Sequence, residues 1–428
     1  MENKWFVWIG ILFLSINFLT TNAYSSQENN LVKFITMADI HFDPFIACYR
    51  EKIHPCPIIQ KLRQAPIPQW SSLLAKYDTE PPYYRFNTNY PLLVSSLTSA
   101  KKIAAQSNPQ FILILGDFIG HDYRESYQQY TNDHSKIGYQ SFFNKTMEYL
   151  TSELTKTFPN TEIFPVVGNH DSYFGNYVFY ANTKFYNQLL TIWTPLMKDQ
   201  KNRASLASSF SIGGYYAVDI PTHSNLRLIV LNTILFSDKV MGRGINQAAL
   251  NELDWFHQQL ELARLKNQKV IIAMHIPPGI DIYATLKLRL FRLLDLWKLT
   301  YTKRFEAELR AFAPEIIGIF TGHLHIDWFQ ILTLDNFHSI PVSGSPSISP
   351  VYGNNPGFKL FTYSLQLQRF IDFETYSYSI DSNRFWERIS YENKYHQNLF
   401  SLQSSNNANP AISHKLLLEQ FTALKAAP

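Results

Sequence analysis

The stretch FTGHLHIDWF, residues 320–329, places two histidines one residue apart at the end of an apolar run. His323 and His325 share one face of an extended strand, where imidazoles can either ligate a metal or hydrogen-bond inside a core. The choice between the two depends on whether other ligand residues occur in similar positions along the chain.

Four further groups of polar residues follow apolar, β-branched runs in the same way. They supply carboxylates, imidazoles and one amide oxygen, which suit borderline divalent cations such as zinc, manganese or iron. In chain order they are Asp39-x-His41, Gly116-Asp117, Gly168-Asn169-His170-Asp171 and His275. A single ion would not need so many ligands, so the pattern predicts two ions about 3.5 to 4 Å apart that share a bridging carboxylate. Asp117, alone on its strand, is the natural bridge.

The elements that carry these residues must bring them to one edge of a sheet. The apolar runs that precede them are typical of short buried strands. Helix-like segments lie between the runs, notably 246–265, where Leu250, Leu253, Phe256 and Leu260 recur at helical spacing. Strands that alternate with helices predict an α/β sheet protein, whose ligands bind at the carboxyl ends of the strands.

This ordered set resembles the five-part signature of the calcineurin-like metallophosphoesterases over about residues 31–345. The resemblance implies the four-layer fold of that family, a double β-sheet sandwich flanked by helices. It also implies two ligand sets that share the bridge Asp117: Asp39, His41 and His325 for one metal, and Asn169, His275 and His323 for the other. The expected cofactor is therefore a pair of divalent ions, with zinc as the expected identity.

Two residues beside the ligands are expected to act near the phosphate. In the family, the residue after the Asn ligand, here His170, faces the phosphate as an acid or a transition-state donor. Asp171 is expected to orient His170 by accepting from its other ring nitrogen, with a turn cap as the alternative.

A closer likeness points to the acid sphingomyelinase-like phosphodiesterases. It is carried by DIHFDP (39–44), GDFIGHD (116–122) and SPSISPVYGNNPGF (345–358). In that group a His stands four residues after the bridging Asp, here His121, and we expect it to protonate the leaving group. The chain lacks the Cys-rich saposin domain and the extra C-terminal disulfides of acid sphingomyelinase, which favours a nucleotide or another small phosphodiester over sphingomyelin. Gly120 stands where purple acid phosphatases need a Tyr, which excludes that group.

The expected activity is hydrolysis of phosphodiester or phosphoanhydride bonds by a metal-bridging hydroxide. Nucleotides or phosphocholine-type head groups are the expected substrates. Two alternatives stay open: a sphingomyelin phosphodiesterase that acts on lipid, and a catalytically inactive secreted binding protein on the same scaffold. A net charge of +4 without a Lys/Arg block gives no support to a nucleic-acid-binding surface. The oligomeric state stays open.

The N-terminus predicts export. Residues 1–23 are typical of a cleaved signal peptide, because Lys4 precedes an apolar run, Trp5 to Leu19, that is shorter than the about 20 residues of a membrane span. We therefore expect a secreted or periplasmic protein without stable membrane insertion. The chain has two cysteines, Cys48 and Cys56, and we expect them to form one disulfide.

The catalytic domain is expected to span residues 31–375. Within it, residues 45–90 are Pro-rich and aromatic without a clear period, and we interpret them as a lid or wall beside the site, with surface cover as the alternative. The aromatic segment 173–193 could form the opposite wall. Residues 376–428 lose the alternation of strands and helices, and are expected to form a small C-terminal appendage.

Overall fold

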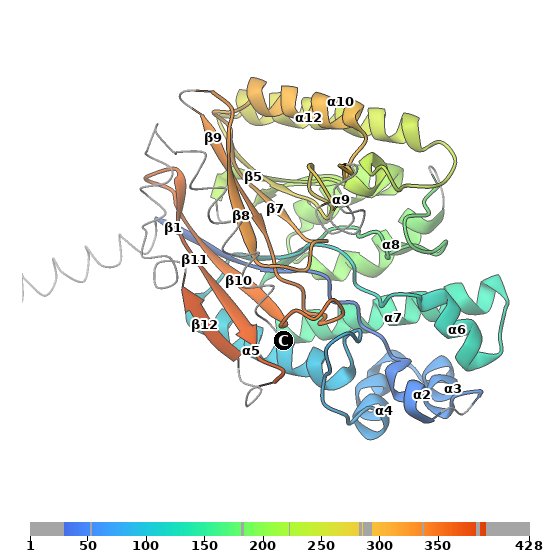
Figure 1. The fold of residues 1–428 in the computed structure, drawn as a ribbon. Helices are drawn as coiled ribbons and strands as arrows, with labels where there is room; N and C mark the ends of the chain where they lie inside the picture. Colours follow the sequence, from blue (N-terminus) through green and yellow to red (C-terminus); the bar gives the residue numbers. More distant parts are fainter. Residues whose placement is uncertain are drawn as a thin grey trace, which may run out of the picture.

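Two sheets packed face to face, with helices on their outer sides, form the protein (Figure 1). The computed structural model describes residues 30–51, 54–180, 184–221, 223–281, 285, 293–335, 338–381 and 386–390. The predicted signal peptide and residues 391–428 lie outside this part of the chain. The predicted α/β class and double-sheet sandwich are confirmed.

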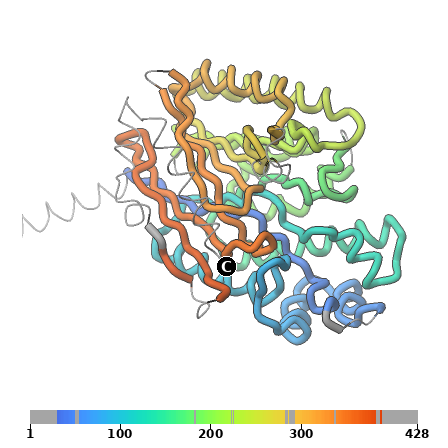
Figure 2. The backbone as a smooth tube through the Cα atoms, in the orientation of Figure 1, coloured from blue at the N-terminus to red at the C-terminus, as the bar shows by residue number. Residues whose placement is uncertain are grey.

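The first sheet joins the beginning of the described chain to its end. Its strands, in spatial order, are β12 (Trp386–Ser390), β11 (Arg369–Tyr378), β10 (Gly357–Ser364), β1 (Leu31–Met37), β2 (Phe111–Ile114) and β3 (Glu162–Pro165). β1, β2 and β3 are parallel, whereas β10 runs antiparallel to β1. Figure 2 shows β1, in blue, beside the orange-red strands of the C-terminal part.

The second sheet is built from the middle of the chain. Its strands, in spatial order, are β4 (Tyr216–Ile220), β5 (His223–Val230), β6 (Lys269–Ala273), β7 (Ile316–Thr321), β9 (Ser339–Gly344) and β8 (Trp328–Thr333). β5, β6, β7 and β9 are parallel, so their carboxyl ends lie at one edge.

The helices form the outer layers. In Figure 1, α10 and α12 run along the second sheet, while α5 and α7 lie beside the first. Their bounds, with those of the 3-10 helices, are α2 (Ile46–Glu51), α3 (Pro57–Gln64), η1 (Ile67–Gln69), α4 (Trp70–Tyr77), α5 (Tyr90–Ser107), α6 (Tyr123–Thr131), α7 (Lys136–Thr157), α8 (Lys184–Trp193), η2 (Thr194–Leu196), α9 (Gln200–Gly213), η3 (Thr233–Phe236), α10 (Ile245–Leu265) and α12 (Leu299–Ala311). None of the helices in the described ranges has the length and apolar character needed to cross a membrane.

Aromatic side chains fill the space between the sheets. Phe34 of β1 lies edge-on to Phe320 of β7 with ring centroids 5.0 Å apart, and Phe361 of β10 lies 4.9 Å from Phe320. All three rings are buried, and truncating such a Phe to Ala typically costs about 3 to 5 kcal/mol. The two sheets therefore form a stable frame for the loops at their edges.

The expected boundary at residue 375 falls inside β11, which continues to Tyr378. β12 pairs with β11 from Glu374↔Ser390 to Tyr378↔Trp386. Burial persists across the boundary, because Phe373, Thr375 and Tyr376 are all buried. Residues 376–378 and 386–390 thus extend the first sheet.

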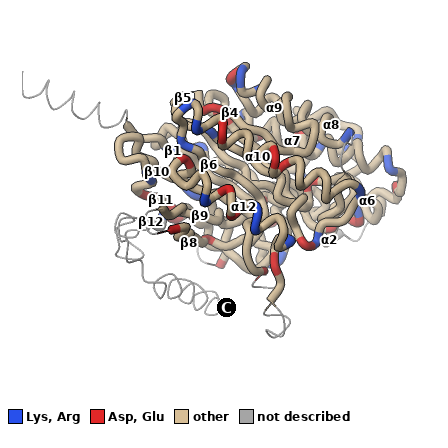
Figure 3. Tube along the Cα trace, turned by 90° about the horizontal axis from the view of Figure 1, so that it is seen from above, with Lys and Arg blue, Asp and Glu red and all other residues tan. Residues whose placement is uncertain are grey.

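Residues 45–90, expected as a lid or wall, form α2, α3, η1 and α4 before leading into α5 (blue in Figure 1). The predicted disulfide is confirmed: Cys48 of α2 is bonded to Cys56, the residue before α3. Figure 3 shows acidic and basic positions interspersed along the described chain.

Candidate metal centre

The predicted ligand residues meet at the carboxyl ends of strands from both sheets. They follow β1, β2 and β3 in the first sheet and β6 and β7 in the second, and all except His323 are buried: Asp39, His41, Asp117, Asn169, His275 and His325. His41 and His325, which are 284 positions apart in the sequence, are thereby in contact.

The loops that carry these residues have an unusual backbone. Asp39, His41, Asp117, His323 and His325 all adopt positive φ angles, between 43° and 70°. Residues other than Gly seldom occupy this left-handed region, and each such residue costs on the order of 1 to 3 kcal/mol unless its surroundings fix it. A concentration of strained residues of this kind is typical of functional sites.

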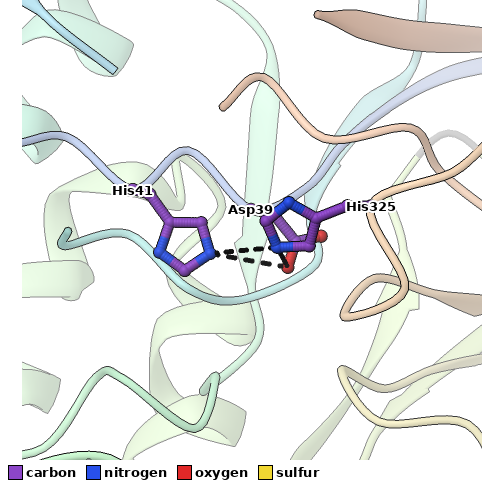
Figure 4. A group of neighbouring side chains, drawn as sticks. All are labelled: Asp39, His41 and His325. Carbon is purple, nitrogen blue, oxygen red and sulfur yellow. Dashed lines mark hydrogen bonds and ion pairs between the residues drawn. The ribbon is translucent and has the colours of Figure 1, made fainter. Parts of the chain in front are cut away.

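The first cluster contains Asp39, His41 and His325, whose side chains point toward one another (Figure 4). The Nε2 atom of His325 lies 3.3 Å from Asp39 Oδ1 and 3.2 Å from His41 Nε2. Three ligand atoms therefore surround one small volume.

The second cluster contains Asp117, His275 and His323, with Asn169 beside them. His275 Nε2 lies 3.3 Å from Asp117 Oδ2 and 2.9 Å from Asn169 Oδ1. The same oxygen, Asp117 Oδ2, lies 3.4 Å from His41 Nε2 of the first cluster. The other oxygen, Asp117 Oδ1, accepts the backbone N–H of His170 at 2.8 Å. One carboxylate oxygen is thus shared by the two clusters.

The donor set fits cations. His41 Nδ1 donates to the carbonyl oxygen of Ile119 at 3.0 Å, so the lone pair of Nε2 faces the cluster. The Nδ1 atom of His325 is buried without a hydrogen-bond partner among the described residues. Imidazole lone pairs and carboxylates that face one another in a buried volume form a favourable site for divalent ions.

The pKa values of the histidines in the two clusters also favour cation binding. Burial, with a contribution from the nearby His121, lowers the pKa of His41 well below its usual value, and burial with His275 does the same for His323. Burial by itself would lower the pKa of His275, but the carboxylates of Asp117 and Asp39 raise it to about 9. The neutral imidazoles are ready ligands, and a cation would displace the proton that His275 holds.

His121 and His170 lie over this centre. The ring of His121 stacks on that of His41 at 4.1 Å between centroids and lies 4.3 Å from that of His170. Burial and the neighbouring imidazoles of His170 and His325 lower the pKa of His121 to about 3. Its Nε2 lies 3.4 Å from the hydroxyl of Tyr352, a residue that is 62% exposed.

Asp171 does not occupy the expected place beside the His170 ring. Its Oδ2 accepts the backbone N–H groups of Asp117 and Gly168, both at 2.9 Å, and its Oδ1 accepts that of Phe118 at 2.8 Å. Both oxygens are therefore used to join the loops after β2 and β3. Gly168 permits this approach, because a Cβ there would lie 2.1 Å from Asp117 N.

Sequence reasoning missed four residues that contact the site. Asn169 Nδ2 donates to Asn176 Oδ1 at 2.8 Å, and the hydroxyl of Tyr177 lies 3.2 Å from His323 Nε2. Asn87 and Tyr352 both contact His121. Asn87, Asn176 and Tyr177 lie in the segments interpreted as walls, and no pattern in the sequence separates them from their neighbours. Tyr352 lies in a stretch quoted above for its family likeness.

Comparison with known proteins agrees with this geometry. The family described as calcineurin-like phosphoesterase matches residues 32–327. The sphingomyelinase phosphodiesterase D of Dictyostelium discoideum is 29% identical over 302 residues, which cover 69% of this chain and 61% of that protein.

Two animal relatives extend the comparison. The cyclic GMP-AMP phosphodiesterase SMPDL3A of Bos taurus is 27% identical over 242 residues, or 53% of this chain and 49% of that protein. The human acid sphingomyelinase-like phosphodiesterase 3b is 26% identical over 360 residues, or 80% of this chain and 70% of that protein. The chain thus spans 61% and 49% of the lengths of the first two relatives. The likeness to acid sphingomyelinase-like phosphodiesterases is confirmed.

Proposed function

Since the chain belongs to the calcineurin-like phosphoesterase family, we propose that it is a binuclear-metal phosphodiesterase. The observation that carries the proposal is the position of Asp117 Oδ2, 3.4 Å from His41 Nε2 and 3.3 Å from His275 Nε2. One carboxylate oxygen between two sets of ligands is the arrangement that a two-metal hydrolase requires.

The two cations would be held by two sets of side chains that share Asp117: Asp39, His41 and His325 for one, and Asn169, His275 and His323 for the other. Mixed nitrogen and oxygen ligands favour zinc among the common divalent ions. Such a pair activates water as the nucleophile and neutralises charge on the phosphate oxygens. Metal analysis of the purified protein should find about two zinc ions per chain.

The protein's own residues would complete the reaction. His170, whose ring lies 5.2 Å from that of His41, would donate a hydrogen bond to the phosphate. His121 would protonate the leaving group, because the negative charge of a bound diester favours the protonated imidazole. Asp171 would hold the loops of Asp117 and His170 in register rather than act on the substrate.

Small phosphodiesters or phosphoanhydrides are the proposed substrates, with nucleotides and phosphocholine-type head groups as the first candidates. The exposed ring of Tyr352 beside His121 offers an aromatic surface on which a base could stack. One relative is named for cyclic GMP-AMP and another for sphingomyelin, so hydrolysis of sphingomyelin is the alternative.

A substrate panel tests the proposal. Nucleotide diesters, choline-phosphate diesters, sphingomyelin in micelles and bis(4-nitrophenyl) phosphate should be compared at acid and neutral pH. We expect His121→Ala to slow diesters with poor leaving groups by on the order of 10² to 10⁴, and nitrophenyl esters only slightly, because nitrophenolate leaves without a proton. Equal losses on both types would contradict the role of His121. An absence of turnover by the zinc-loaded protein would favour the inactive binding protein.

We also propose that the protein is secreted or periplasmic after removal of residues 1–23, and that the catalytic domain begins at residue 31 and continues past the expected boundary at residue 375 to include β12. The disulfide between Cys48 and Cys56 suits an oxidising compartment. N-terminal sequencing of exported protein tests this, and a protein retained in the cytoplasm with its first residues intact would refute it.

A further inference from the structure

We propose that Asn87, held by Asp43, is a positioning residue that fixes the His121 ring with Nδ1 donating to Asn87 and Nε2 beside Tyr352. The catalytic meaning of this arrangement rests on the function proposed above. The geometry itself does not, so the two can be tested separately.

Three segments lie side by side beneath His121. The backbone N–H of Asp43 donates to Thr88 O at 2.9 Å, and that of Thr88 donates to His41 O at 3.0 Å. On the other side, the N–H of Gly120 donates to Phe42 O at 3.0 Å. Residues 87–88 and 119–120 therefore flank the first ligand loop, residues 39–43, which brings Asn87 next to both Asp43 and His121.

Asp43 and the backbone of His121 determine which way the Asn87 amide points. Its Oδ1 accepts the backbone N–H of Phe45 at 2.8 Å, while its Oδ2 accepts from the Tyr49 hydroxyl at 2.7 Å and from Asn87 Nδ2 at 3.0 Å. On the other side of Asn87, the backbone N–H of His121 can only donate, and it lies 3.3 Å from Asn87 Oδ1. The amide oxygen therefore faces His121, and the NH₂ group faces Asp43.

This oxygen determines which ring nitrogen carries the proton. Asn87 Oδ1 lies 2.8 Å from His121 Nδ1 and 3.3 Å from the backbone N of His121. A carbonyl oxygen can only accept, so Nδ1 must be the donor. Nε2, which lies beside Tyr352, is then the atom that exchanges a proton with the substrate.

The contact between Asn87 and Asp43 also explains why residue 120 is a glycine. A Cβ on Gly120 would lie 2.9 Å from Asn87 Nδ2 and 3.0 Å from Asp43 Cβ. The Asn87–Asp43 pair thus fills the space that a side chain at position 120 would need.

The first test is the tautomer of His121 in the zinc-loaded protein, measured by ¹⁵N NMR of labelled imidazoles. The signals of His121 are those that His121→Ala removes. We expect a protonated Nδ1 in the wild type and a mixture of tautomers in Asn87→Leu. A wild-type His121 with its proton on Nε2 would overturn the proposal, and this measurement needs no variant at position 87.

The second test is kinetic. Asn87→Leu should lower kcat by about 10-fold to 100-fold on a diester with an alkyl leaving group, and should hardly change turnover of bis(4-nitrophenyl) phosphate. In the His121→Ala background, Asn87→Leu should cause no further loss, whereas additive losses would show that Asn87 acts independently of His121. Asn144→Leu is the matched control, because it removes another half-buried amide that accepts from the hydroxyl of Tyr173.

The experiments distinguish a failure of the donor role of His121 from a failure of the positioning role of Asn87. If His121→Ala slows alkyl and nitrophenyl diesters equally, the proposed donor role of His121 fails, while the tautomer still decides whether Asn87 positions the ring. If the tautomer is unchanged in Asn87→Leu, the positioning role fails whatever the kinetics.

Discussion

Asp117 is the residue on which the two ligand clusters depend, because its Oδ2 lies between them while its Oδ1 accepts the N–H of His170. Asp117→Asn keeps an oxygen for that N–H but loses the negative charge. We expect the variant to fold, to bind fewer than two metals per chain, and to lose turnover by at least about 10²-fold. Metal analysis and circular dichroism on the same sample measure this.

The control for Asp117→Asn is Asp254→Asn, at an exposed carboxylate of α10 that pairs with Arg304. That variant should keep full activity. Wild-type turnover in Asp117→Asn would contradict the binuclear centre.

Another single residue, Glu252 of α10, affects the stability of the fold. It is fully buried, its Oε1 accepts the N–H of Asn232 at 2.6 Å, and burial raises its pKa well above the usual 4.5. A carboxyl group whose pKa is raised in the folded state stabilises the fold below its unfolded pKa and loses that contribution as pH rises through the folded pKa. Glu252→Gln mimics the protonated acid at every pH.

The unfolding free energy of the wild type should therefore fall relative to that of Glu252→Gln as pH rises above about 4.5, by at most about 1.4 kcal/mol per pH unit. Urea unfolding at several pH values measures the difference. Glu261→Gln, at a half-exposed position of the same helix, should show no such trend. A constant difference between wild type and Glu252→Gln would mean that Glu252 titrates normally.

At the scale of elements, the disulfide fixes α2 to the start of α3 and supports Tyr49, whose hydroxyl donates to Asp43. The closed loop is short, so replacing Cys48 and Cys56 by Ser should cost only about 2 to 3 kcal/mol of stability. We expect the larger effect on kcat, because Tyr49 of α2 contacts Asp43, which holds the Asn87 that positions His121. Calorimetry and kinetics on the double variant test this, and free thiols in exported protein would contradict it.

For the whole molecule, the metals are expected to stabilise the fold, because the ligands come from both sheets. A ligand at a hundredfold excess over its Kd adds about 2.7 kcal/mol. Chelation should therefore lower Tm by several degrees, and zinc should restore it. Asp117→Asn should respond less to both treatments, while an unchanged Tm in chelated wild type would argue against cations at this centre.

The sequence by itself determined the order of the strands along the chain and the residue types at their ends. The strands that lead to the site are short apolar runs that end in carboxylate, amide or imidazole residues, so the residues of the two clusters and the α/β fold could be predicted without coordinates. The disulfide between Cys48 and Cys56 could be predicted because the chain has no other cysteine.

Only the tertiary structure decided the contacts between distant segments. Asp171 was expected beside His170, yet its carboxylate joins two loops, because backbone N–H groups converge there once β2 and β3 pair. Asn87 reaches His121 through the pairing of residues 87–88 with the first ligand loop. Hydrogen bonds between segments leave no period in a sequence, since they depend on which strand ends become neighbours.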